Sequence, residues 1–315
     1  MDIGSVCLLG GSGFLGRSIA DQATERGIRV RVVTRNAARA RALTVLPTVE
    51  LMEGDPSDEA TLAAAFEGMD AAVNLVGILH ESRAHSFSAV HAALPHAVGR
   101  AASAAGIQHL VHVSALGASD KAPSNYLRSK AAGEAALRMG AGVVPWTILR
   151  PSVMFGEGDH FLNLFASLAK LFPVLPLAGA GARFQPVWVE DAARCCVAAL
   201  GDTRSFGQAY ELCGPRVYTL EELVRLVAVT LGVRRTVVAL PAALGEMQAF
   251  ALEHLPGTLM TRDNLRSMSV PNVCSGKRPP VCDFEPTAVE AVLPQYLGAA
   301  SSQARYARYR NHAGR

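Results

Sequence analysis

Tyr126 and Lys130 are the residues whose types and spacing most directly indicate chemistry. They stand four residues apart in a segment of helical composition, SNYLRSKAAGE. Because a helix completes one turn in about 3.6 residues, both side chains leave the same face. An ammonium group beside a phenol lowers the phenol pKa from about 10, so the pair suits proton transfer. The same spacing also fits two ordinary residues on a solvated helix face, and the rest of the sequence must decide between these interpretations.

A glycine-rich turn near the start of the chain is the second chemical signal. The segment LLGGSGFLGRSIA sets Gly10, Gly13 and Gly16 between a short apolar run and a helical run. Glycine there permits a tight turn, lets the backbone approach a pyrophosphate and lets the helix pack closely on the strand. The free N–H groups of the new helix, which begins with Phe14 and Leu15, would then face the phosphates. Glycines in a plain turn are the alternative, but the strand–turn–helix context favours dinucleotide binding.

The residues after the second apolar run indicate which dinucleotide binds. NAD sites usually place an acid there for the ribose 2′-hydroxyl, whereas an arginine suits a 2′-phosphate. This sequence has Thr34, Arg35 and Asn36 at that place and no acid, followed by Arg39 and Arg41. A guanidinium matches a phosphate with two parallel hydrogen bonds. We therefore expect NADP(H) in preference to NAD(H), with a solvent-exposed arginine cluster as the alternative.

Three further residues fit the same site. Asp55 follows the third apolar run and is placed for the adenine amino group, or else to cap the next helix. Gly77 follows the fourth run, where it would let the backbone approach the cofactor. Asn74, just before it, would brace that loop or belong to the core strand.

These residues need a scaffold of alternating strands and helices. Short apolar runs predict strands at Val6–Leu9, Arg29–Thr34, Val49–Met52, Ala71–Val76, Leu110–Val113 and Val144–Leu149. Helical segments are predicted at Phe14–Arg26, Asp58–Glu67, Ser88–Ala105 and Ser124–Met139. This alternation predicts an α/β fold with a doubly wound, Rossmann-type parallel sheet covered on both faces.

The remainder of the chain is expected to be a smaller C-terminal region for a substrate or partner. We predict a dinucleotide-binding domain over 1–150 and about 184–213, a smaller region over 151–183 and 214–300, and a basic tail over 301–315. The apolar segment FLNLFASLAKLFPVLPLAG would line a substrate pocket, face a membrane or partner, or belong to the core. The arginine-rich tail is expected to be solvated, with binding to an anionic surface as the alternative.

Composition excludes several classes of protein. The formal net charge is only +3 and aromatic residues make up 6% of the 315, which argues against nucleic-acid binding. No Cys or His cluster has metal-ligand spacing, so no metal site is expected. The six cysteines are interpreted as free thiols in a reducing compartment. No apolar run reaches the ~18 residues of a membrane span, and the start of the chain does not read as a signal peptide, so a cytoplasmic protein is expected.

With these motifs in order, the chain resembles the extended, atypical branch of the short-chain dehydrogenase/reductase superfamily, which is NAD-dependent epimerase/dehydratase-like. The resemblance covers nearly the whole chain. It is similar in particular to the group of the dehydrogenase-like accessory subunit of respiratory complex I and its bacterial relatives. The motifs that carry the resemblance are GGSGFLG, VHVSALGAS, YLRSKAAGE, ILRPSVMFGEGDHFLN, FQPVWVEDAARC and YELCGPRVYTLEELV.

The resemblance implies roles for individual residues. Tyr126 would be the general acid/base, and Lys130 would lower its pKa and hold the nicotinamide ribose. Ser114 would bind the substrate oxygen, and Pro151 would line the nicotinamide end of the cofactor. The chain departs from the pattern at Leu116, where many extended members have the catalytic hydroxyl.

Two functions therefore remain open. The first is a protein that holds a nicotinamide dinucleotide mainly for the structure or assembly of a respiratory or quinone-related system. It would have a respiratory-complex or membrane-peripheral partner and would lie at the inner face of the membrane. The alternative is an NADP(H)-dependent oxidoreductase or epimerase that uses Tyr126 and Lys130 on an apolar carbonyl compound. A regulatory redox sensor is a weaker third, because such relatives usually lack the Tyr–Lys pair.

Overall fold

The computed structural model of this chain describes residues 1–82, 85–254, 260–276 and 278–298. They form two compact units, which we describe separately. Unit 1 consists of Met1–Pro151, Val189–Leu212 and Ser275–Phe284, and unit 2 of Ser152–Trp188, Cys213–Cys274 and the described residues from Glu285 onward.

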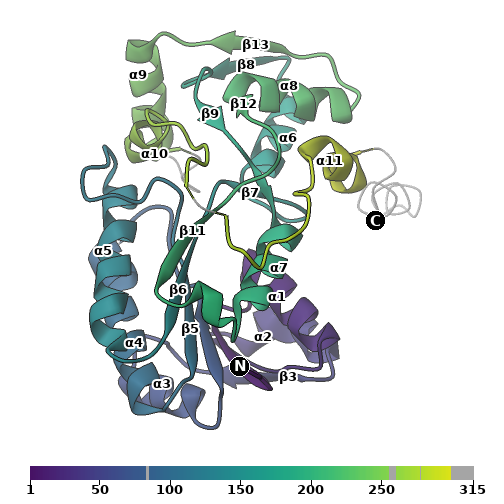
Figure 1. Ribbon diagram of the computed structural model, residues 1–315. Coiled ribbons are helices and arrows are strands. Elements are labelled where there is room, and N and C mark those ends of the chain that lie inside the picture. The colour runs from purple at the N-terminus through teal and green to yellow at the C-terminus, as the bar shows by residue number, and fades with distance from the viewer. Residues whose placement is uncertain (83–84, 255–259, 277, 299–315) are drawn as a thin grey trace. The chain divides into compact units, whose positions relative to one another are not determined.

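The core of unit 1 is a seven-stranded parallel sheet in the order β11-β6-β5-β4-β1-β2-β3 (Figure 1). The strand order reverses at β1, between β2 and β4, which is where dinucleotides bind in doubly wound sheets. The register runs Leu9, Asn74, His112 and Ile148 across β1, β4, β5 and β6. The strands are β1 (Ser5–Leu9), β2 (Arg29–Thr34), β3 (Val49–Glu53), β4 (Ala71–Asn74), β5 (His109–Val113), β6 (Trp146–Pro151) and β11 (Gln208–Leu212).

Helices cover both faces of this sheet (Figure 1). On one face, α3, α4 and α5 bury Phe66, Val98 and Leu137 against Leu9 and Leu110 of the strands. On the other face lie α1 and α7, which contact each other. The helices of unit 1 are α1 (Phe14–Glu25), α2 (Ala37–Ala40), α3 (Glu59–Phe66), α4 (Leu94–Ala104), α5 (Asn125–Ala141) and α7 (Val189–Ala199), with 3-10 turns η1 (Arg41–Val45) and η3 (Thr203–Ser205).

The predicted α/β Rossmann fold is confirmed, and two local features differ from expectation. The segment expected to be one helix over Ser88–Ala105 begins as a π-helix, η2 (Ser88–Ala93), and continues as α4. The sheet also gains β11, which pairs with β6 from a distant part of the chain. Neither feature has a local signal, because both depend on what the segment packs against.

Unit 2 has three two-stranded sheets and its own apolar core. Phe155, Leu162, Leu223 and Leu293 lie at the centre of that core. A capping box of Thr219 and Glu222 opens α8. The elements are β7 (Met154–Phe155), α6 (Leu162–Leu171), β8 (Val174–Leu177), β9 (Arg183–Phe184), β10 (Val187–Trp188), β12 (Tyr218–Thr219), α8 (Leu220–Thr230), β13 (Thr236–Ala239), α9 (Ala242–Glu253), α10 (Arg262–Ser267) and α11 (Val289–Leu297).

The expectation that all six cysteines are free thiols is wrong for four of them. Cys195 and Cys282 form a disulfide within unit 1, and Cys213 and Cys274 form one within unit 2. Each pair is separated by more than sixty residues, with separations of 87 and 61. Spacing along the sequence therefore gave no sign of them. Cys7 and Cys196 are free and buried.

The Cys195–Cys282 disulfide helps to explain why the two units differ from the predicted division of the chain. Residues 275–284 were expected in the smaller region, whereas Ser275–Phe284 belongs to unit 1. Besides the Cys282 disulfide, the backbone N–H groups of Ser275 and Gly276 donate to the Glu211 carboxylate at 2.7 and 2.6 Å. The predicted basic tail, 301–315, lies outside the described residues.

Candidate dinucleotide-binding site

The turn after β1 has the geometry that a pyrophosphate site requires. Gly10 has a φ of +81°, in the left-handed region that favours glycine, and its carbonyl accepts the Gly13 N–H at 3.0 Å. A Cβ on Gly16 would lie 2.5 Å from the Gly11 Cα, so Gly16 is needed for packing. A Cβ on Gly13 would meet only the Gly10 carbonyl oxygen, at 3.2 Å. Gly13 is therefore the glycine whose outer side is open to a ligand.

The N-terminus of α1 is available to an anion. Gly13 occupies the cap position, and within the described part of the chain no side chain caps this helix end or places an acid in its first turn. Phe14 and Leu15 contribute their backbone N–H groups, while the Leu15 side chain is buried. Uncapped N–H groups and the positive end of the helix dipole favour a phosphate here.

Arg35 lies at the end of β2 and is exposed. Its Nη1 lies 3.0 Å from Nε2 of His85. Asp55 accepts hydrogen bonds from the backbone and hydroxyl of Ser57 at 2.9 and 2.8 Å. These bonds, and to a smaller degree the charges of Arg35 and His85, lower the Asp55 pKa. Asp55 does not cap α3, because Asp58 does so through the Thr61 N–H.

Tyr126 and Lys130 lie in the first two turns of α5, which begins at a Ser124 cap. Lys130 is buried, and its Nζ donates to the Val113 carbonyl at the end of β5 at 3.0 Å. Burial lowers the pKa of Lys130 to about 8. Burial also raises the pKa of Tyr126 to about 12, opposite in direction to the expected effect of the lysine. The cause is desolvation of the phenol, which disfavours the phenolate form.

Ser114 follows β5, and its buried Oγ is without a hydrogen-bond partner among the described residues. Its backbone N–H donates to Leu149 at 2.8 Å, which fixes the residue beside β6. Leu116 is also buried, and its N–H donates to the carbonyl of Pro151, the last residue of β6, at 2.9 Å. The Ser114 hydroxyl is thus the group at this strand end that is free for a ligand oxygen.

Gly77 lies on the loop after β4, next to Lys130. A Cβ on Gly77 would stand 3.5 Å from the Lys130 Nζ and 3.4 Å from the His91 Nε2. Asn74 braces this loop as expected, because its Oδ1 accepts the Val76 N–H at 3.1 Å. His91 was not predicted as a site residue, and its position in η2 has no sequence signal. Its buried ring is the main addition that the structure makes to the site.

A buried ion pair supports α5 one turn after Lys130. Glu134 is buried and accepts from Nε and Nη2 of Arg150 at 2.7 and 2.6 Å. Arg138 adds a third contact at 3.3 Å. The negative charge of Glu134 also partly offsets the lowering of the Lys130 pKa by burial.

The structure brings the predicted residues together in unit 1, after the carboxyl ends of its strands. Gly10, Gly13 and Gly16 follow β1, Arg35 follows β2 and Asp55 follows β3. Gly77 follows β4 and Ser114 follows β5, while Lys130 reaches β5 from α5. Within the residues described, no cluster of His, Cys, Asp and Glu has the arrangement of a metal site. The same part of the chain has no helix long and apolar enough to span a bilayer.

Comparison with known proteins agrees with this geometry. A family model described as NAD(P)H-binding matches residues 10–160. Subunit 9 of the NADH dehydrogenase [ubiquinone] 1 alpha subcomplex, mitochondrial, is 37% identical over 227 residues in Arabidopsis thaliana, covering 70% of this chain and 56% of that protein. The mouse protein of the same name is 34% identical over 227 residues, covering 70% and 59%. The chain thus spans less than two thirds of the length of these relatives.

A third relative is covered more fully. A ceramide reductase of Caulobacter vibrioides is 32% identical over 249 residues, covering 76% of this chain and 74% of that protein. Among solved structures, a nucleoside-diphosphate-sugar epimerase from Staphylococcus aureus has a TM-score of 0.74 at 19% identity, covering 92% of this chain and 99% of that one. An NADPH-dependent quinone oxidoreductase from Escherichia coli, solved with NADPH, has a TM-score of 0.73 at 21% identity, covering 91% and 98%. Together with the phosphate turn and the Tyr126–Lys130 pair, these similarities show that the chain is an NAD(P)-binding member of the extended, atypical short-chain dehydrogenases/reductases, homologous to subunit 9 of respiratory complex I.

Proposed function

We propose that this protein holds NADP(H) mainly to stabilise its fold and to serve the assembly of a respiratory or quinone-related system. The observation that carries the proposal is the contrast between an intact cofactor site and a weak proton donor. The phosphate turn and Lys130 are ready to bind the dinucleotide, whereas burial raises the pKa of Tyr126 to about 12. Leu116 also fills the position where a second hydroxyl would bind a substrate carbonyl.

The preference for NADP(H) is supported by charge at the end of β2. Arg35 and His85 lie 3.0 Å apart, and both can donate to a 2′-phosphate. A hydrogen bond to a charged group contributes about 1.5–3 kcal/mol, or roughly 10–100-fold in affinity. The carboxylate of Asp55, which follows β3, is already engaged by Ser57.

Isothermal titration of NADPH and NADH tests this preference. The unmodified protein should bind NADPH more tightly, and Arg35→Asp should reverse the order. Arg100→Asp is the matched control, because it makes the same charge change at an exposed residue of α4 and should leave the order unchanged. Tighter binding of NADH by the unmodified protein would refute the preference.

The Tyr126→Phe variant separates holding from catalysis. It removes the phenol hydroxyl and keeps the ring, so NADPH binding should persist. If the cofactor is only held, the variant behaves like the unmodified protein in NADPH-oxidation assays. Robust oxidation by the unmodified protein that falls about a hundredfold in Tyr126→Phe would replace the proposal with the enzymatic alternative.

The alternative is an NADP(H)-dependent oxidoreductase or epimerase acting on an apolar carbonyl compound or quinone. One observation favours it: the buried Ser114 hydroxyl is without a partner in the described part of the chain. If the protein is such an enzyme, the Ser114 hydroxyl binds the substrate oxygen while Tyr126 supplies the proton. A screen of quinones and long-chain ketones with Ser114→Ala as the comparison tests this reading.

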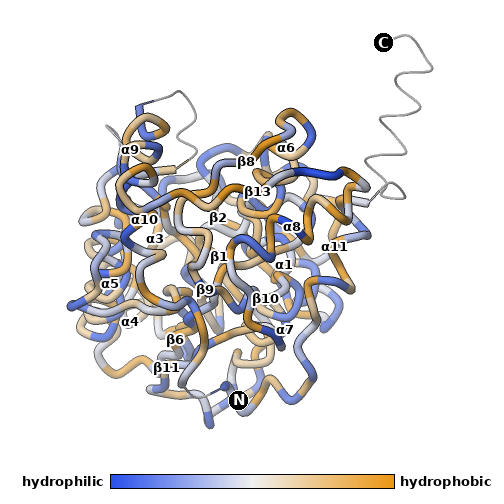
Figure 2. Tube along the Cα trace, turned by 90° about the horizontal axis from the view of Figure 1, so that it is seen from above, coloured by the Kyte–Doolittle hydropathy of each residue, from blue (hydrophilic) through white to orange (hydrophobic). Residues whose placement is uncertain are grey.

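An exposed apolar surface on unit 2 supports a protein partner, and through it peripheral association with a membrane. Figure 2 shows hydrophobic stretches along α6, β8 and β13. No acid occurs in 170–182 or 231–245, while Lys170 and Arg234 lie in these segments. The partner that fits is a respiratory-complex subunit with an apolar surface bordered by acidic groups. The exposed side chains are Leu171, Phe172, Val174, Val238, Leu244, Met247 and Phe250.

Co-purification with identified NADH dehydrogenase subunits from mildly solubilised membranes tests this surface. Met247→Glu should abolish co-purification, and Val143→Glu, which alters an exposed apolar residue of unit 1, should not. Binding of the unmodified protein to protein-free anionic vesicles, lost in Met247→Glu, would instead identify lipid as the occupant.

A further inference from the structure

The π-helix η2 carries a buried histidine next to the cofactor site. His91 is 2% exposed and lies in Ser88–Ala93, where the helix is wider than the α4 that follows. A Cβ on Gly133 of α5 would lie 2.0 Å from the His91 carbonyl oxygen. The two helices are therefore in direct backbone contact at this residue.

Hydrogen bonds fix both nitrogens of the His91 ring. The backbone N–H of Ile78 donates to Nε2 at 3.0 Å, so Nε2 carries no proton. Nδ1 then carries the proton and donates to the Ser129 Oγ, 2.8 Å away. The Ser129 hydroxyl donates in turn to the Tyr126 carbonyl at 2.7 Å. This chain of bonds links the loop after β4 to the first turn of α5 through one neutral imidazole.

The ring also packs against the residues that it links. It stacks on Phe87 with ring centroids 5.2 Å apart and meets the Tyr126 ring edge-to-face at 5.8 Å. Its Nε2 lies beside the point where a Cβ on Gly77 would stand, and so does the Lys130 Nζ. Burial, with a smaller effect of the Lys130 charge, lowers the pKa of His91 to about 3, which agrees with the neutral ring.

We propose that His91 is a positioning residue that holds the Gly77–Ile78 loop and α5 in one fixed arrangement, and thereby places Lys130 for the nicotinamide ribose. The inference rests on the proposed binding of NADP(H) at this site. It assigns His91 to the nicotinamide half of the cofactor only. In the proposed site the adenosine half and its phosphates meet Arg35 and the turn at Gly13, whereas the hydrogen bonds of the His91 ring to described residues go to Ile78 and Ser129.

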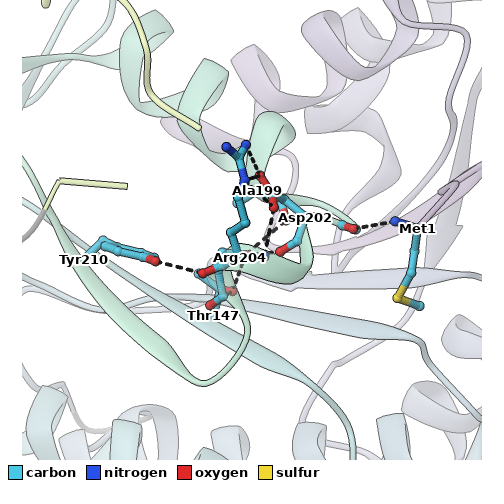
Figure 3. Close-up of polar contacts among 8 residues, drawn as sticks. Met1, Thr147, Ala199, Asp202, Arg204 and Tyr210 are labelled. Atoms are coloured by element: carbon cyan, nitrogen blue, oxygen red, sulfur yellow. Dashed lines mark hydrogen bonds and ion pairs between the residues drawn. The ribbon is translucent and has the colours of Figure 1, made fainter. Parts of the chain in front are cut away.

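Unit 1 offers a matched control in His109. Its Nδ1 accepts the Gly201 N–H at 3.2 Å, and its Nε2 donates to the Thr147 Oγ1 at 2.9 Å. It is as buried as His91 and packs on Phe206 at 4.6 Å. Figure 3 shows Thr147 in its polar network, near Met1 and Asp202. This network lies at the amino ends of β5 and β6, the opposite edge of the sheet from the site.

The experiment compares His91→Phe with His109→Phe. Each variant keeps an aromatic ring and loses one bond to a backbone N–H and one to a hydroxyl. Calorimetry measures the affinity for NADPH and for 2′,5′-ADP, which is the adenosine half without the nicotinamide mononucleotide half. His91→Phe should weaken NADPH about tenfold or more and change 2′,5′-ADP less than about twofold. His109→Phe should change neither affinity, although it should lower the melting temperature as much.

Equal weakening of both ligands by His91→Phe, or no weakening of either, would overturn the inference. Equal effects of the two histidine variants on the affinity for NADPH would do the same. If the unmodified protein binds neither ligand, the proposed function fails, which is a distinct result. If His91→Phe does not fold, Ser129→Ala cuts the same link at its second bond and should show the same selective loss of NADPH affinity.

Discussion

Gly13→Ser is the perturbation that most sharply tests the cofactor site, because it should affect stability and binding differently. Gly13 has φ −76° and ψ −178°, an extended conformation that any residue adopts. Serine is a better N-cap than glycine by a few tenths of a kcal/mol, since its hydroxyl accepts a free N–H of the first turn. That gain offsets the close approach of a new Cβ to the Gly10 carbonyl oxygen, at 3.2 Å. The free energy of unfolding without ligand should therefore stay within about 1 kcal/mol.

Binding should respond strongly to the same change. The serine side chain would occupy the open side of Gly13 and use the N–H groups that a pyrophosphate needs. NADPH at a hundred times its dissociation constant stabilises the unmodified protein by about 2.7 kcal/mol. For a unit of this size, that corresponds to a rise in melting temperature of about 5–10 °C. If the affinity falls a hundredfold, the stabilisation falls to about 0.4 kcal/mol and the rise nearly vanishes.

Thermal melting with and without NADPH provides the assay, and Gly16→Ala provides the control. A Cβ on Gly16 would lie 2.5 Å from a backbone atom, which no side-chain movement relieves. Gly16→Ala should therefore destabilise the protein itself by about 1–3 kcal/mol or more. A Gly13→Ser protein that keeps the full NADPH-induced rise would refute the assignment of this turn to the pyrophosphate.

Three further predictions follow from the site and its surroundings. NADPH affinity should be constant between about pH 7, where the 2′-phosphate is ionised, and about pH 8. Above pH 8 it should fall by up to about tenfold per unit, because Lys130 loses its proton near pH 8 in the free protein but keeps it in the complex; Lys130→Met, titrated by calorimetry, should remove the slope. Glu134→Gln should lower stability by about 3 kcal/mol in urea unfolding, since it leaves the Arg150 charge without its carboxylate. Cys213→Ser should cost about 4 kcal/mol, from the 61-residue separation that the disulfide to Cys274 closes, and peptide mapping without reductant should recover that pair.

The sequence was sufficient for the phosphate turn and for most of the sheet. Most strands from β1 to β6 are short apolar runs whose burial is visible locally, whereas β3, at the edge of the sheet, has no buried residue. The alternation with helices then allows few topologies. The turn after β1 was recognisable because the glycines stand at fixed spacing between a strand and a helix. The Tyr126–Lys130 pair and the Ser124–Glu134 segment were likewise local, since one helix carries them.

The tertiary structure decided what depends on contacts between distant residues. His91 meets Ser129 across 38 positions, Arg35 meets His85 across 50, and Cys195 meets Cys282 across 87. No spacing rule connects such residues, because the fold alone brings them together. The same is true of the pKa of Tyr126. The sequence placed a lysine beside it and predicted a lower pKa, whereas burial, which only packing determines, raises the pKa instead.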